Sequence, residues 1–270
     1  MSKKIVTFIV VLICFTMNLT ACGFSSSSSR VSSRSDDPEI VALTKAIIDN
    51  PEDAEAYFNR GYAYSDRDEY ELAIVDYKRA IKLDPKYVKA YSKRGIAYSE
   101  TGQHDLAIAD YNKAIKLDSK CIGAYYNRGT TYIAKGQDDL AIADYNKTIE
   151  LNPKFVNAYN NRGLLYIKKG QYDLGMADLN KAIELDPKNV GAHFNRANEY
   201  IEKKKYDLAI ADFSKIIEID PKNVQAYFGK SAVLEMINRK QDAIDNYNNL
   251  IKNVPEDQEG VVKPKKELKR

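Results

Sequence analysis

Small and large apolar residues recur along this chain with a period of 34 positions. The stretches AYFNRGYAYSDRDEYELAIVDYKRAIKLDP (56–85), AYYNRGTTYIAKGQDDLAIADYNKTIELNP (124–153) and AYNNRGLLYIKKGQYDLGMADLNKAIELDP (158–187) align without an insertion. Prolines mark the same point of the repeat at Pro51, Pro85, Pro153, Pro187, Pro221 and Pro255, and Ser119 replaces the missing one. This repetition predicts six copies of one structural unit between residues 51 and 255.

The apolar pattern within each unit predicts a pair of helices. Counted from Ala54, position 4 is large, position 8 is small and position 11 is aromatic in most units, as in Tyr57, Gly61 and Tyr64. These three positions share one helical face. A small residue at position 20 and a large one at position 24 follow in the second helix. Small residues at positions 8 and 20 allow the two helices to approach closely.

Turn residues support the same division. Gly102, Gly136 and Gly170 fall where the first helix of a unit should end, a place that favours left-handed backbone. Asp-Pro pairs, such as Asp84-Pro85, separate one unit from the next because proline cannot continue a helix.

The whole pattern resembles the tetratricopeptide repeat, a helix-turn-helix unit. The resemblance covers residues 54–255, about three quarters of the chain. It implies an all-α fold, a right-handed α-solenoid of antiparallel helix pairs with a concave face. Residues 38–50 align with the second helix of a unit that lacks its first helix, and we expect this half-repeat to cap the stack. We expect the polar tail at 256–270 to be frayed or loosely helical.

The N-terminus predicts a signal peptide at 1–21. Lys3 and Lys4 precede the apolar run IVTFIVVLICFTM, which is shorter than the roughly 20 residues of a membrane-spanning helix. Leu19-Thr20-Ala21-Cys22 resembles the lipobox of bacterial lipoproteins. The resemblance implies cleavage before Cys22 and acylation of that residue by chains such as palmitate. An uncleaved signal anchor and a plain secreted protein are the alternatives.

A serine-rich stretch follows the cysteine and predicts a flexible tether at 22–37. Several acyl chains hold a protein on a bilayer almost permanently, because each buried CH₂ contributes about 0.8 kcal/mol. We therefore expect the protein in the bacterial cell envelope, attached to the lipid bilayer through Cys22. The resemblance to lipoproteins also implies the outer membrane, in a cell that has one, because Gly23 and not an aspartate follows the cysteine.

Charge and composition exclude several classes of function. The chain has 41 basic and 38 acidic residues, a net charge of +3, which gives no reason to expect a nucleic-acid partner. Cys121 is the one cysteine beyond residue 22, so no internal disulfide framework is expected. Neither His104 nor His193 has a nucleophile at a recognised spacing, and no metal-binding or nucleotide-binding motif is present. The sequence favours a protein that is not an enzyme and needs no cofactor or metal.

A pair of charges recurs inside the repeat. Position 7 is arginine and position 23 is aspartate in five units, whereas the sixth unit has Lys230 and Asn246. Because both charges change together, we predict an ion pair between the two helices of each unit. Two independent solvated charges are the alternative. The predicted pairs are Arg60 with Asp76, Arg94 with Asp110, Arg128 with Asp144, Arg162 with Asp178, and Arg196 with Asp212.

The first helices of such repeats line the concave face, so the resemblance implies a peptide site there. Positions 2, 6, 9 and 13 form one stripe, and asparagine is common at position 6. Asparagine amides both donate to and accept from a peptide backbone. Solvated asparagines, and aromatics half-buried between repeats, are the alternatives. The candidate binding residues are Asn59, Tyr62, Lys93, Tyr126, Asn127, Asn160, Asn161, Phe194, Asn195 and Asn198.

Together these features predict a membrane-anchored scaffold or adaptor that binds an unidentified protein or peptide in the cell envelope. One alternative is a self-associating structural spacer whose end repeats stack on one another. The other is an enzyme or a carbohydrate-binding protein, for which the sequence offers no recognisable site.

Overall fold

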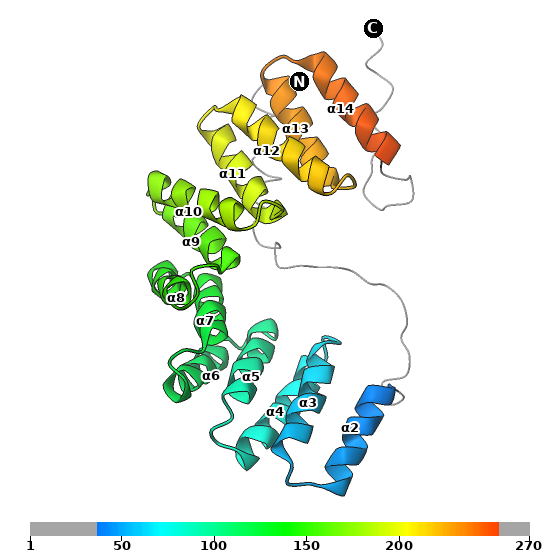
Figure 1. Ribbon diagram of the computed structural model, residues 1–270, viewed down its shortest axis with the longest axis vertical. Coiled ribbons are helices and arrows are strands. Elements are labelled where there is room, and N and C mark those ends of the chain that lie inside the picture. Colours follow the sequence, from blue (N-terminus) through cyan, green and yellow to red (C-terminus); the bar gives the residue numbers. More distant parts are fainter. Residues whose placement is uncertain (1–36, 254–270) are drawn as a thin grey trace. The chain divides into compact units, whose positions relative to one another are not determined.

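The computed structural model describes residues 37–253, and these residues form thirteen α-helices and no strand (Figure 1). The predicted signal peptide, Cys22 and the tail at 256–270 lie outside the described residues. Within 37–253, no helix has both the length and the apolar character needed to cross a bilayer.

The helices alternate as the sequence predicts, after a single leading helix α2 (Pro38–Asp49). The first helices of the six repeats are α3 (Ala54–Ser65), α5 (Val88–Glu100), α7 (Ile122–Ala134), α9 (Val156–Lys168), α11 (Val190–Glu202) and α13 (Val224–Met236). The second helices are α4 (Tyr70–Leu83), α6 (His104–Leu117), α8 (Asp138–Leu151), α10 (Tyr172–Leu185), α12 (Tyr206–Ile219) and α14 (Lys240–Asn253).

The described chain divides into two units, 37–165 and 166–253, each of which has its own packing. In the first unit every helix from α2 to α8 packs on the next helix in sequence. In the second unit the same holds from α10 to α14. Consecutive packing of helix pairs confirms the predicted fold class, an all-α solenoid.

Small residues and large rings build the core of each repeat. Tyr77, Tyr111 and Tyr145 at position 24 are almost fully buried. A Cβ placed on Gly95 would lie 2.6 Å from Cε1 of Tyr111, so this close approach of two helices needs glycine. Burial raises the pKa of Tyr77 and of Tyr145 to about 12, because a phenolate loses its hydration in the core.

The turn after each first helix has the left-handed backbone that the sequence predicts. The residue that follows the left-handed one donates its backbone N–H to the carbonyl oxygen of the tyrosine or leucine at position 11. Gln103 N, for example, donates to Tyr98 O at 2.7 Å. This bond closes the end of the helix. The left-handed residues are Gly102 (φ 74°), Gly136 (70°) and Gly170 (76°), and also Asp68 (59°), Lys204 (57°) and Asn238 (64°).

Helix α2 stands where the second helix of a preceding repeat would stand, and it packs on α3. Asp37 caps its N-terminus by accepting a hydrogen bond from Glu39 N at 2.9 Å. The same carboxylate accepts from Nη2 of Arg67 at 2.7 Å. Arg60 Nη1 donates to Thr44 Oγ1 of α2 at 3.2 Å, so α2 is bonded to the first repeat at its N-terminus and at its middle.

Candidate functional site

Arginine and aspartate meet in four repeats as two-bond ion pairs. In the first repeat Arg60 Nε and Nη2 donate to Oδ2 and Oδ1 of Asp76 at 2.7 and 2.8 Å. The same geometry, at 2.6 to 2.9 Å, joins Arg94 to Asp110, Arg128 to Asp144, and Arg196 to Asp212. Each of these aspartates is buried. Arg162 and Asp178 belong to the two different units, so their pairing stays a prediction.

Tyrosine rings lie on both sides of three of these guanidinium groups, on the same helix. Cζ of Arg94 lies 5.6 Å from the ring centroid of Tyr91 and 5.7 Å from that of Tyr98. Arg60 and Arg128 have the same two neighbours, at positions 4 and 11. The ring faces attract the cation, so the tyrosines and the carboxylate together hold the arginine in place. Sequence reasoning treated these tyrosines only as apolar filling, although in these three repeats they stand three residues before and four after the arginine.

The same arginines also connect neighbouring repeats. Nη1 of Arg196 donates to Asn180 Oδ1 at 2.7 Å, and Nη1 of Arg162 donates to Asn146 Oδ1 at 2.6 Å. Arg128 makes the equivalent bond to Asn112. One guanidinium therefore joins both helices of its repeat to the second helix of the repeat before it. Sequence reasoning missed this role, and its signal was an asparagine sixteen residues before the arginine.

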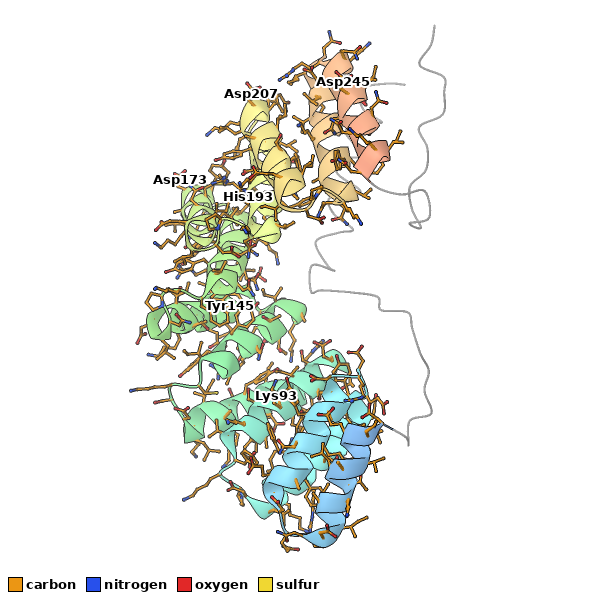
Figure 2. The ribbon with its side chains drawn as sticks, turned by 45° about the vertical axis from the view of Figure 1, so that its right-hand side comes forward. Lys93, Tyr145, Asp173, His193, Asp207 and Asp245 are labelled. Atoms are coloured by element: carbon orange, nitrogen blue, oxygen red, sulfur yellow. The ribbon has the colours of Figure 1, made fainter. Side chains whose placement is uncertain are left out.

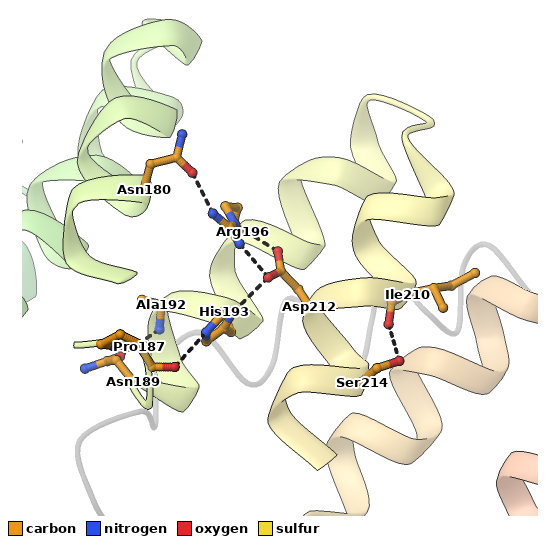
Figure 3. A network of polar contacts seen from close by, with 9 residues as sticks. All are labelled: Asn180, Pro187, Asn189, Ala192, His193, Arg196, Ile210, Asp212 and Ser214. Carbon is orange, nitrogen blue, oxygen red and sulfur yellow. Dashed lines mark hydrogen bonds and ion pairs between the residues drawn. The ribbon is translucent and has the colours of Figure 1, made fainter. Parts of the chain in front are cut away.

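The fifth repeat has a histidine where other repeats have tyrosine (Figure 3). His193 is buried, its Nδ1 lies 2.7 Å from Asp212 Oδ1, and its Nε2 lies 3.1 Å from the carbonyl oxygen of Pro187. Both neighbours are acceptors, so a ring N–H on either nitrogen has a partner. Burial alone would raise the pKa of Asp212, but the hydrogen bonds from His193 and Arg196 outweigh it and lower that pKa below its usual range.

The sixth repeat replaces the ion pair with an amide. Asn246 Nδ2 donates to the carbonyl oxygen of Tyr227 and to Ser231 Oγ, both at 2.8 Å. Burial lowers the pKa of Lys230, and the charge of Arg239 lowers it further. The last repeat thus keeps a polar contact between its helices without a charged pair.

The candidate binding residues of the first unit lie on four first helices, α3, α5, α7 and α9. Helix α5 touches both α3 and α7, so their exposed positions follow one another across the unit. Asn59 is exposed and the Tyr62 side chain is 40% exposed. Lys93, labelled in Figure 2, is half-buried and places Nζ 4.6 Å from the ring centroid of Tyr62. We call Asn59, Tyr62 and Lys93 the first-helix face.

Several other candidates are occupied inside the stack. Asn161 Nδ2 lies 3.3 Å from the hydroxyl of Tyr126 and 3.4 Å from that of Tyr145, and Asn160 Nδ2 donates to Asn161 Oδ1 at 3.1 Å. The ring of Tyr126 packs 4.8 Å from the Phe155 ring, centroid to centroid. These side chains hold repeats together, as the half-buried alternative expects. Asn127 is half-buried.

In the second unit Phe194, Asn195 and Asn198 are half-buried. The ring centroid of Phe194 lies 5.6 Å from that of Phe213, so this aromatic also packs inside its repeat. Gly229 holds the place that asparagine has in other repeats, and a Cβ there would lie 2.6 Å from Cζ of Phe213. Packing therefore explains why the row of asparagines ends before the sixth repeat.

The chemistry on offer is that of binding. Within 37–253 no group of three or more His, Cys, Asp or Glu side chains is placed to hold a metal ion. Cys121 is half-buried, and desolvation raises the pKa of its thiol, which disfavours the reactive thiolate. The arginine, aspartate and histidine side chains described above are engaged in joining helices.

The helix pairs, the turn geometry and the packing positions define a class, the helical repeat proteins. The family described as tetratricopeptide repeat matches residues 54–87, 88–121, 156–189 and 190–223, and a further family described as TPR repeat matches 129–170. The chain belongs to the tetratricopeptide repeat family. Proteins of this family are in general scaffolds that bind other proteins.

Solved structures of other repeat proteins are similar to this chain. YrrB, described as a TPR protein with an unusual peptide-binding site, is 28% identical with a TM-score of 0.55, over 70% of this chain and 97% of YrrB. MamA is 33% identical with a TM-score of 0.53, over 55% of this chain and 87% of MamA. PilF of Pseudomonas aeruginosa shares the fold at 17% identity and a TM-score of 0.65, over 77% and 92%. Curated protein sequences give no significant match.

Proposed function

We propose that this protein is a lipid-anchored scaffold of the bacterial cell envelope that binds a protein or an extended peptide through its first-helix face. The repeat fold itself favours a protein or peptide partner. The observation that carries the proposal is the contact of α5 with both α3 and α7, with Asn59, Tyr62 and Lys93 left accessible on the outside of this layer.

The first-helix face offers three kinds of contact to a peptide. The Asn59 amide both donates and accepts, the Tyr62 ring supplies exposed apolar area, and the Lys93 ammonium supplies a charge beside that ring. Aromatic and cationic side chains of this kind are enriched among residues that dominate interfaces. The peptide-binding site described for YrrB, a similar structure over 70% of this chain, supports the same use of the fold here.

Attachment to a membrane rests on the sequence before residue 37. The lipobox resemblance at Leu19 to Cys22 supports acylation, and the serine-rich stretch behind it supports a tether. A tethered binder raises the effective concentration of its site near the membrane, so even a modest affinity becomes useful.

Mass spectrometry of the mature N-terminus tests the anchor. Trypsin should release a peptide that begins at Cys22 and ends at Arg30, carrying the mass of its acyl chains. Cys22→Ser should abolish incorporation of an alkyne-labelled fatty acid, whereas Cys14→Ser, the matched control, should leave incorporation unchanged. A mature chain that begins at an unmodified Cys22, or at an earlier residue, contradicts the anchor.

Crosslinking in the native cell, followed by mass spectrometry, tests the binding role. A partner crosslinked to the unmodified chain should be lost when Asn59, Tyr62 and Lys93 are all changed to alanine. The matched control changes Val41 and Ile48 to alanine, because these exposed residues lie on α2 and not on a first helix. Equal loss in both variants, or loss in neither, contradicts the assignment of the first-helix face.

A further inference from the structure

Exposed leucines recur on the second helices of both units, and neither the core nor the first-helix face uses them. Position 19 of five successive repeats is leucine, with exposed fractions between 43% and 53%: Leu72, Leu106, Leu140, Leu174 and Leu208. Single exposed apolar residues are ordinary, but the same position exposed on α4, α6 and α8 gives the first unit a repeated apolar surface.

The next exposed position of the same helices is also apolar. Position 22 is Val75, 62% exposed, in α4, and an exposed alanine in the following second helices. Alanine lets a packed helix come close, and leucine beside it supplies area to bury. Within the first unit we call Leu72, Val75, Leu106, Ala109, Leu140 and Ala143 the leucine face.

Charges of opposite sign lie at the two ends of this face. Position 18, beside each leucine, is acidic, and position 26 is basic. Eight residues of helix separate the two by about 12 Å along the axis, with the apolar position 22 midway between them. In the first unit the acids are Glu71, Asp105 and Asp139, and the bases are Arg79, Lys113 and Lys147.

We propose that the leucine face pairs with the same face of a second copy of this chain, each of the first three repeats opposite the same repeat of the copy. A two-fold axis along the row of leucines lays α4, α6 and α8 antiparallel to their copies. It then brings the acids of one chain opposite the bases of the other, which favours association. A two-fold axis across the row would bring acids opposite acids, so the charges select the first arrangement.

The sixth repeat is unlike the others at these two positions. It has Asp242 at position 19 and Asp245, exposed and labelled in Figure 2, at position 22. The apolar residues of positions 19 and 22 are therefore absent from the sixth repeat.

Some of the charges already have partners within the chain. Arg79 Nη2 lies 3.2 Å from Glu52 Oε1, Lys147 Nζ lies 2.5 Å from Glu150 Oε1, and Lys135 is bonded to Asp105. The carboxylates of these three pairs are exposed, and exposed ion pairs contribute little to stability. Replacing them with ion pairs across the interface therefore costs little free energy.

This pairing is independent of the proposed function. It covers second helices and leaves Asn59, Tyr62 and Lys93 accessible. Because the axis runs along the row, helix α2 of both copies lies at the same end.

Disulfide trapping of the full chain in native membranes tests the pairing. Ala109→Cys places its thiol close to the two-fold axis and should give a disulfide-linked dimer under mild oxidation. Thr130→Cys is the matched control, exposed at a first helix, and should give no more dimer than the unmodified chain with its native cysteines. Equal dimer yields for the two variants overturn the proposal.

Two further changes in the Ala109→Cys background define the interface. Leu106→Glu with Leu140→Glu should lower the dimer yield at least about tenfold, because each change buries an unpaired charge. Ile251→Glu, at a residue of similar exposure on α14, should leave the yield unchanged. Thermal melting followed by circular dichroism serves as the control that each variant still folds. A yield that resists the leucine changes, or falls equally with Ile251→Glu, contradicts the proposal.

Charge reversal tests the relative orientation of the copies. Asp105→Lys should lower the yield, because it faces Lys113 of the copy, and the double change Asp105→Lys with Lys113→Asp should restore it. A double variant no better than the single one excludes the antiparallel pairing of α6. The two proposals can fail separately. If alanine at Asn59, Tyr62 and Lys93 has no effect on partner capture but the disulfide-linked dimer still forms, the proposed function fails and this pairing stands.

Discussion

At the scale of residues, one guanidinium unites three helices. Arg128 donates two hydrogen bonds to Asp144 and one to Asn112 of the preceding repeat, and it lies beside the rings of Tyr125 and Tyr132. Buried charge is tolerated only where every group has a partner. The arrangement therefore fixes both the angle within a repeat and the register between repeats.

Removing one partner of an ion pair should show how much the pair contributes to the stability of the fold. Arg128→Met leaves Asp144 buried without its cation and should lower the free energy of unfolding by about 3 kcal/mol. Urea denaturation followed by circular dichroism measures the change. Lys230→Met, in the repeat without an ion pair, is the matched control and should cost much less. Equal losses would mean that the pair contributes little.

The lowered pKa of Asp212 predicts that acid lowers the stability of the fifth repeat. The pKa of this carboxylate is lower in the folded than in the unfolded chain, so its stabilising effect is present above the unfolded pKa, about 3.9, and is lost as the pH falls through the folded value. Asp212→Asn should reduce stability at pH 7 and flatten the dependence between pH 5 and pH 2. Urea midpoints across this range check it, with the exposed Asp207→Asn as control. An unchanged slope in Asp212→Asn contradicts the prediction.

The pairing of arginine with aspartate could be predicted from the sequence because both residues change together in the sixth repeat. The flanking tyrosines and the asparagine at position 25 could not be placed, because their contacts depend on how rings and helices turn after packing. For Asn161, a sequence pattern suggested a ligand, whereas packing directs its amide to two tyrosine hydroxyls.

At the scale of elements, the turn inside each repeat shows how local sequence determines helix ends. Three repeats use glycine for the left-handed residue, and the other three use Asp68, Lys204 and Asn238. A side chain in that conformation costs roughly 1 kcal/mol, which glycine avoids. The closing bond from Lys205 N to Tyr200 O, at 2.7 Å, is kept in spite of this cost.

Lys204→Gly should therefore stabilise the protein, by about 1 kcal/mol. Thermal unfolding should show a higher midpoint. Lys203→Gly is the matched control, because its neighbouring position has an ordinary φ of −88° and glycine there should destabilise. A lower midpoint for Lys204→Gly would show that the lysine side chain makes a contact that outweighs the backbone cost.

Helix order and turn positions were predictable because the 34-residue period repeats the same local rules in every unit. The exposure of position 19 was not predictable from one repeat. Leu72 and Tyr77 are both large and both on α4, yet Tyr77 is fully buried whereas Leu72 is 43% exposed. Only the packing of first helices on both sides decides which face of a second helix remains open.

At the scale of the whole molecule, each repeat contacts mainly its neighbours, and stability is close to a sum over repeats and interfaces. Such a chain can present one surface on its first helices and another on its second helices without either disturbing the core. In our proposals the first-helix face binds the partner and the leucine face pairs with a second copy of the chain.

Site-specific photocrosslinking in the living cell tests this division most directly. A benzophenone amino acid at Tyr62 and the same amino acid at Leu72 probe two positions of one repeat with similar exposure, 40% and 43%. The account predicts that Tyr62 links to a partner protein and that Lys93→Glu weakens this link, whereas Leu72 links to a second copy of the chain. A partner that crosslinks at Leu72 and not at Tyr62 would contradict it.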